Sequence, residues 1–170
     1  MELEDFLRPL YQDLDGVTRF DAVERVGRIA RQLYTPASDG DMRAFELLLL
    51  FHGLGKWLEK MGNVSRTALA VGIDEIELRQ TVASIARLAE PSSEAERAVA
   101  AAILIDNAGV RGLAERLSRA WREGQSVADV VRAELAEAER PEWLSGEARE
   151  WLAQRRERRR EFCRAVLEEL

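Results

Sequence analysis

The residue best suited to chemistry in this sequence is its only histidine, His52. It follows the apolar run Leu47 to Phe51, where a polar ring must find a partner. Imidazole is the commonest side-chain metal ligand, so one interpretation is a metal site at His52. The structural alternative is a core histidine that hydrogen-bonds to its neighbours. The spacing alone leaves both interpretations open.

Other common kinds of chemistry find no support in the sequence. The single cysteine, Cys163, excludes an internal disulfide and a cysteine-rich zinc site. No glycine-rich phosphate loop, nucleotide-binding fingerprint, Ser-His-Asp order or Cys-His pair is present. An arginine-rich run at 155–160 can contact phosphates as a basic helix face, but glutamates on the same helix favour a solvated, salt-bridged surface.

The elements that must position His52 are helices. Apolar residues recur at helical spacing nearly throughout, and glycine or capping residues divide them into about eight helices with no clear strand. The sequence therefore predicts an all-α fold, a compact multi-helix bundle. The predicted helices span about 2–13, 18–34, 42–61, 65–71, 75–89, 94–105, 110–122, a segment after 126, and 145–170. Asp74 to Glu77 and Ser93 to Glu96 have the spacing of capping boxes.

The helix predicted at 42–61 is apolar nearly all round its first half, which indicates the central, most buried helix. It contains two glycines, Gly53 and Gly55, each costing roughly 1 kcal/mol relative to alanine inside a helix. We expect them to allow another helix to approach closely. A void at Gly53 would be filled by a neighbouring side chain or by water.

The segment Phe45 to Lys56 resembles the central helix of the HD-domain phosphohydrolases. In that family an apolar run leads into a His-Asp doublet, an apolar residue, Gly and Lys, and here the doublet reads His52-Gly53. The alanine-rich segment 100–108 is similar to the family's later helix, with Asp106 in the place of a ligand. The resemblance covers about 21–127, so the chain is predicted to be one HD-like domain with a C-terminal helical extension, 128–170, packed on it.

The family pattern is incomplete in this chain. The first family histidine falls on about Ala22, the doublet aspartate is Gly53, and the histidines expected near Arg87 or Leu88 are absent. Two of four ligand positions remain, His52 and Asp106, whereas catalytic zinc usually has three protein ligands. Asp21 or Glu24 is a possible substitute ligand, and the alternative is that both are solvated. Without a metal, Asp106 caps the following turn or accepts a hydrogen bond from His52.

The resemblance also gives Lys56 two interpretations. It follows His52 by one helical turn, where an ammonium can contact a phosphate. The alternative is that its side chain extends to solvent at the helix end. Neither interpretation supplies the missing metal ligands.

Three functions follow from these residues. The favoured expectation is an HD-fold protein with a degenerate metal site, without phosphohydrolase activity and with no cofactor, that serves a structural, regulatory or interaction role. The second is a phosphohydrolase of nucleotides or phosphomonoesters that holds a divalent ion (Mn, Mg, Fe, Ni or Zn) with substituted ligands. The third is an unrelated helical binding domain.

Charge and hydropathy restrict the partners. The net charge is −6 and the sequence pI is near 5.1, so nucleic acid is not an expected partner. The acidic N-terminus and the short apolar runs predict no membrane segment, and the lone cysteine favours the cytoplasm. Aromatic and apolar residues of the last helix are expected to dock it on the domain or on a second copy, which makes a homodimer an expected state. A protein partner or a phosphorylated small molecule is not identified by the sequence.

Overall fold

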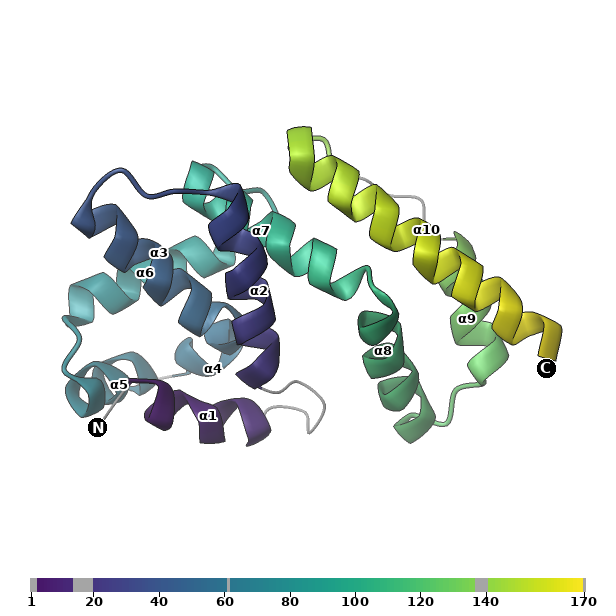
Figure 1. Ribbon diagram of the computed structural model, residues 1–170. Coiled ribbons are helices and arrows are strands. Elements are labelled where there is room, and N and C mark those ends of the chain that lie inside the picture. The colour runs from purple at the N-terminus through teal and green to yellow at the C-terminus, as the bar shows by residue number, and fades with distance from the viewer. Residues whose placement is uncertain (1–2, 14–19, 61, 137–140, 170) are drawn as a thin grey trace. The chain divides into compact units, whose positions relative to one another are not determined.

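The computed structural model describes residues 3–13, 20–60, 62–136 and 141–169, and in these ranges the chain is helical with no strand (Figure 1). The prediction of an all-α fold is confirmed. None of the described helices is long and apolar enough to cross a membrane. The helices are α1 Leu3–Asp13, α2 Phe20–Leu33, α3 Asp39–Phe51, α4 Gly55–Leu58, α5 Asn63–Val71, α6 Glu75–Ala86, α7 Glu94–Asn107, α8 Val110–Arg122, α9 Val127–Ala136 and α10 Gly146–Glu169, with a 3-10 turn, η1, at His52–Leu54.

The helix predicted from Met42 to Met61 is interrupted, so this prediction was wrong. α3 ends at Phe51, η1 follows, and α4 covers only Gly55–Leu58; Met61 lies outside the described residues. Both glycines of the segment lower its helical propensity. The 3-10 turn therefore occurs where the chain is least able to sustain a regular α-helix, and it contains His52.

The predicted capping signals are confirmed at one helix and in part at another. Ser93 Oγ accepts a hydrogen bond from the Glu96 amide, and Glu96 accepts one in return from the Ser93 amide, which is a complete capping box at α7. Asp74 caps α6 by accepting from the Ile76 amide at 2.7 Å. Glu77 does not reach back to Asp74, because its carboxylate pairs with Arg43 of α3.

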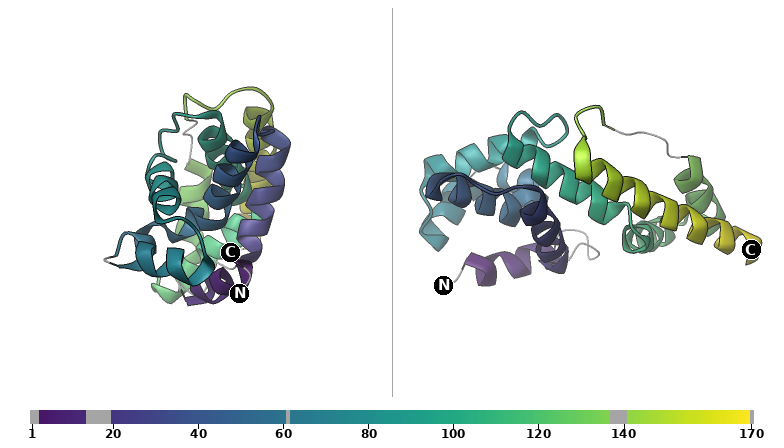
Figure 2. Two further views of the ribbon diagram at one scale, coloured as in Figure 1. Left: turned by 90° about the vertical axis from the view of Figure 1, so that its left-hand side faces the viewer. Right: turned by 45° about the horizontal axis from the view of Figure 1, so that its top comes forward.

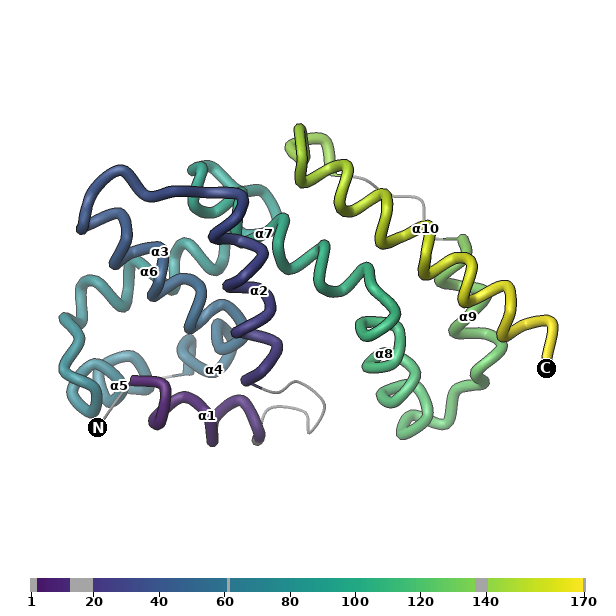
Figure 3. The backbone as a smooth tube through the Cα atoms, viewed as in Figure 1, coloured from purple at the N-terminus to yellow at the C-terminus, as the bar shows by residue number. Residues whose placement is uncertain are grey.

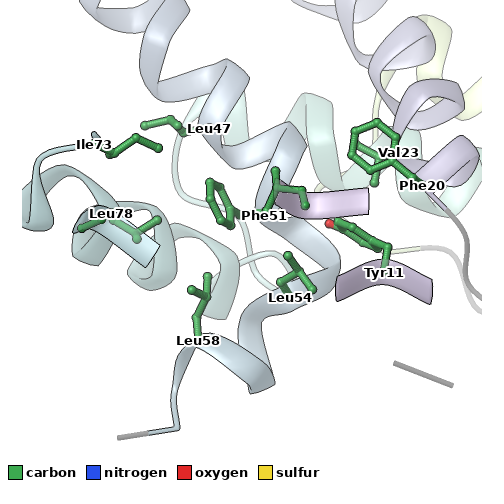
Figure 4. Packing of buried hydrophobic residues seen from close by; sticks show 11 residues of the cluster. Tyr11, Phe20, Val23, Leu47, Phe51, Leu54, Leu58, Ile73 and Leu78 are labelled. Carbon is green, nitrogen blue, oxygen red and sulfur yellow. The ribbon is translucent and has the colours of Figure 1, made fainter. Parts of the chain in front are cut away.

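Contacts within the chain define two compact units, residues 1–100 and 101–170, and the boundary falls inside α7. In the first unit α3 packs lengthwise against α6, and α1 contacts α2 and η1 (Figures 2 and 3). Gly55 permits the close approach of α6, since a Cβ there would lie 2.8 Å from Ile85 Cγ2. The core of this unit is formed by Leu7, Tyr11, Phe20, Val23, Leu47, Phe51, Leu54, Leu58, Ala68, Ile73 and Leu78 (Figure 4).

The second unit packs α8, α9 and α10 around a small apolar cluster of Leu113, Val131 and Cys163. Val166 and Leu167 of α10 pack against this cluster, so the last helix docks within its own unit. Burial raises the pKa of the Cys163 thiol, with a further contribution from the Glu134 carboxylate. The thiol is therefore a neutral core group.

The arginine run at 155–160 was predicted to form a solvated, salt-bridged surface, and its solvation was predicted wrongly for two residues. Arg156 and Arg159 are buried, with relative exposures of 7% and 3%. Arg159 lies 3.0 Å from Glu134 of α9, and Glu134 also lies 2.8 Å from Arg116 of α8. This triad joins three helices; Glu134 and Arg159 are buried and Arg116 is partly exposed, and both arginines also donate to the carbonyl of Asn107 at the end of α7. The buried carboxylate of Glu134 on α9 explains why Arg159 of α10 faces inward.

Candidate functional site

His52 begins the 3-10 turn η1 and is partly buried. Its Nδ1 lies 2.7 Å from the carbonyl oxygen of Leu49 in the preceding turn of α3. A carbonyl only accepts hydrogen bonds, so Nδ1 must carry the proton. In a neutral ring the lone pair is therefore on Nε2, which is the state that a ligating or a hydrogen-bond-accepting histidine requires. The backbone of α3 thus fixes the tautomer of His52.

Gly53, which follows His52 in the 3-10 turn, lies directly against Tyr11 of α1. A Cβ at Gly53 would come within 2.7 Å of Tyr11 Cε1 and 3.2 Å of its hydroxyl oxygen. Carbon atoms do not approach this closely without displacement. The expectation that a neighbouring side chain fills the void at Gly53 is therefore confirmed, and that side chain is Tyr11.

Tyr11 is held at this place by polar and apolar contacts. Its hydroxyl donates to the Leu50 carbonyl at 2.8 Å and accepts from the Gly53 amide at 3.2 Å. Its ring meets Phe20 edge to face at 5.8 Å between centroids, and the side chain is fully buried (Figure 4). Burial raises the pKa of the Tyr11 phenol, and the hydrogen bond from Gly53 opposes this only in part. The phenol therefore stays neutral and keeps the proton that it donates.

The two carboxylates proposed as substitute ligands are both paired with arginines. Asp21 Oδ2 lies 3.0 Å from Arg25 Nη1, one turn along α2. Glu24 Oε1 lies 3.2 Å from Arg8 Nη2 of α1, and both of these side chains are about half exposed. A guanidinium partner competes with a metal ion for the same oxygen lone pairs. The immediate neighbours of Asp21 and Glu24 are thus cations.

The remaining predicted site residues lie in different parts of the chain. Lys56 is exposed on the short helix α4 of the first unit. Asp106 is 9% exposed in the last turn of α7, in the part of that helix that belongs to the second unit. The pairing of His52 with Asp106 stays a prediction.

Arg87 takes part in a partly buried ion pair, in which the carboxylate partner is buried and the arginine is about half exposed. Its Nη2 lies 2.5 Å from Oε1 of Glu96, and Glu96 also accepts from the amide and the hydroxyl of Ser92. Burial alone would raise the pKa of Glu96, but Arg87 and Ser92 outweigh it and lower this pKa to about 2. The carboxylate is therefore fully engaged in joining the end of α6 to the start of α7.

The described residues do not form the ligand set that a catalytic metal needs. Within the ranges that the structure covers, no group of three or more His, Cys, Asp or Glu residues is arranged to hold an ion. Zinc catalysis normally uses three protein ligands and an open position. The donor atoms present at His52 do not fit such a metal, and the space beside Gly53 is occupied by the Tyr11 ring.

Tyr11 is the site residue that sequence analysis did not single out. Its partner, Gly53, is 42 residues away, so no local spacing connects them. The available signal was the apolar stripe of the first helix, in which Leu7 and Tyr11 are one turn apart and face the same side. Together with a glycine in a buried segment, this stripe predicts a close helix contact but not its identity.

Comparisons with protein-family models, with curated proteins and with solved structures find no match to this chain.

Proposed function

We propose that this chain is an HD-fold protein whose metal site is degenerate, and that it has a structural, regulatory or interaction role rather than phosphohydrolase activity. The observation that carries the proposal is the contact between Tyr11 and Gly53. The place where the family has a carboxylate is filled by a tyrosine ring with both of its polar contacts satisfied by backbone. A side chain at residue 53 would have to displace that ring.

The surroundings of the other family positions support the same proposal. The carboxylates of Asp21 and Glu24 lie against Arg25 and Arg8. Arg87 places a guanidinium near the expected position of family histidines, where it stabilises a carboxylate and repels a cation. These features favour a site that has been rebuilt for packing, with no resident cofactor.

Two further parts of the proposal concern setting and partners. We propose a cytoplasmic protein that binds neither membrane nor nucleic acid and that forms a homodimer. The net charge of −6 opposes binding to polyanions, and Phe162 of α10 is 42% exposed. Light scattering of the purified chain at micromolar concentration tests the dimer directly.

A hydrolysis assay separates the proposed function from its main alternative. The purified chain is incubated with nucleotides and with a phosphomonoester in the presence of Mn, Mg, Fe, Ni or Zn ions, beside the His52→Ala variant. We expect both proteins to release phosphate at the same background rate. Metal-dependent hydrolysis that is lost in His52→Ala would establish the alternative, a phosphohydrolase with substituted ligands, and refute the proposal.

A further inference from the structure

The first helix, α1, is attached to the first unit along a single face. Leu7 and Tyr11, one turn apart, are fully buried, and Leu3, Phe6 and Leu10 pack at the margin of the same core. The opposite side of the helix carries exposed charged residues. Figure 3 shows α1 running below α2 and α4, and its principal contacts are with α2 and η1. The helix therefore packs against the turn that contains His52 and Gly53.

α1 is weak as an isolated helix. It has 11 residues, a length at which helices are marginal in water without tertiary packing. Pro9 lies inside it and removes one backbone donor. α1 is consequently helical because it is packed, and it loses its structure when the packing is lost.

The surface contacts of α1 contribute little to holding it in place. Arg8 pairs with Glu24 and lies over the ring of Phe20 at 4.4 Å, but Arg8 and Glu24 are each about half exposed. Exposed ion pairs of this kind typically contribute less than about 1 kcal/mol. The specific polar attachment of α1 is therefore the Tyr11 hydroxyl, which joins it to the Leu50 carbonyl and the Gly53 amide.

We propose that α1 can detach from η1 while the rest of the first unit stays folded, and that the hydrogen bonds of the Tyr11 hydroxyl hold it in the attached state. Opening would expose an apolar face around Phe20 and Leu54, together with one backbone acceptor at Leu50 and one donor at Gly53. The segment that fits this face is an amphipathic helix that presents a tyrosine. α1 is such a helix, so it is itself the occupant that returns to the face on closing. The inference concerns contacts of α1 alone and holds whether or not the chain binds a metal.

Hydrogen exchange of the full chain, followed by mass spectrometry or NMR, tests this inference. We expect the amides of Leu10, Tyr11 and Gln12 to exchange at least tenfold faster than buried amides of α3 and α6, after correction for intrinsic rates. Tyr11→Phe removes the hydroxyl and its two hydrogen bonds but keeps the ring. It should accelerate exchange in α1 by a further factor of about thirty, since the two hydrogen bonds of the hydroxyl together contribute about 2 kcal/mol, and leave α3 and α6 unchanged.

The chain offers a matched control in its other tyrosine. Tyr34 packs edge to face on Phe45, and its hydroxyl makes no hydrogen bond to a described residue. Tyr34→Phe should leave exchange in α1 unchanged. Equal exchange in α1 and α3 of the wild-type chain would overturn the inference, and this comparison needs no variant. It would also be overturned if Tyr11→Phe left α1 unchanged or accelerated α1 and α3 equally.

Discussion

The hydroxyl oxygen of Tyr11 lies 3.2 Å from the amide nitrogen of Gly53, and a Cβ on that glycine would lie 2.7 Å from the tyrosine ring. The two residues are complementary, because the Tyr11 ring occupies the space that a side chain at residue 53 would need. This relationship links the packing of α1 to the absence of a side chain at residue 53. It can be tested through stability as well as through activity.

The first prediction concerns the space at Gly53. Gly53→Ala should lower the free energy of unfolding by about 1–3 kcal/mol, because the new Cβ collides with a buried ring that has little room to move. Chemical denaturation followed by circular dichroism measures the loss. Gly40→Ala is the control, since its Cβ would meet only Ser38 Oγ at 3.9 Å. Equal stability of the two variants would contradict the packing account.

The second prediction is that Tyr11 and residue 53 are energetically coupled. Gly53→Asp should be strongly destabilising alone, and less so in a Tyr11→Ala background, where the carboxylate has space. A double-mutant cycle should give a favourable coupling free energy of about 1–3 kcal/mol. Simple additivity of the two changes would mean that Tyr11 does not occupy the position of a residue-53 side chain.

The third prediction follows from the ionisation of Glu96. Its folded-state pKa of about 2 lies below the ordinary value of 4.5, so the carboxylate stabilises the fold above pH 4.5 and this contribution is lost as the pH falls from 4.5 toward 2. The contribution is on the order of 3 kcal/mol. Glu96→Gln should remove most of this pH dependence, as measured by denaturation between pH 7 and pH 3. Glu94→Gln, an exposed neighbour in the same turn, should retain it.

The fourth prediction concerns the second unit, where α7 ends and α8 begins. A Cβ at Gly112 would lie 2.1 Å from the backbone oxygen of Asn107, which a rigid helix end has no simple way to move. Gly112→Ala should therefore lower the unfolding free energy by about 3 kcal/mol or more. Gly109→Ala, whose Cβ meets nothing closer than 3.6 Å, should be nearly neutral. Hydrogen exchange in α8 and α9 shows whether the loss falls on this unit.

The fifth prediction concerns the triad of Arg116, Glu134 and Arg159, of which Glu134 and Arg159 are buried. Glu134→Gln removes the only negative charge of the triad and leaves two arginines close together, at a cost of about 3–5 kcal/mol. Asp129→Asn breaks an exposed ion pair with Arg132 on the same helix and should cost less than about 1 kcal/mol. Thermal denaturation of both variants makes the comparison. Similar losses would show that the triad is not effectively buried.

Local signals predicted much of the fold. Apolar periodicity placed the helices, and the spacing of Ser93 and Glu96 predicted a capping box because both groups lie within one turn. The same reasoning failed at Glu77, where Arg43 of another helix competes for the carboxylate. The break between the two units was not visible either, because it falls inside the continuous helix α7 and no linker marks it.

The candidate site was predictable in its chain positions but not in its contacts. The sequence identified His52 and the unusual Gly53, and it suggested that a side chain fills the void. It did not identify Tyr11, nor the 3-10 turn, because both depend on how α1 packs against a segment 42 residues away. The inward orientation of Arg159 likewise depends on a glutamate of a different helix.

The stoichiometry of bound metal tests the central claim most directly. The purified full chain and its His52→Ala variant are incubated with Mn, Fe, Ni and Zn ions in turn, dialysed, and analysed by elemental mass spectrometry. If the site is degenerate, both proteins retain far less than one equivalent of each metal, and they retain it equally. Retention of about one equivalent by the wild-type chain, lost in His52→Ala, would contradict the account.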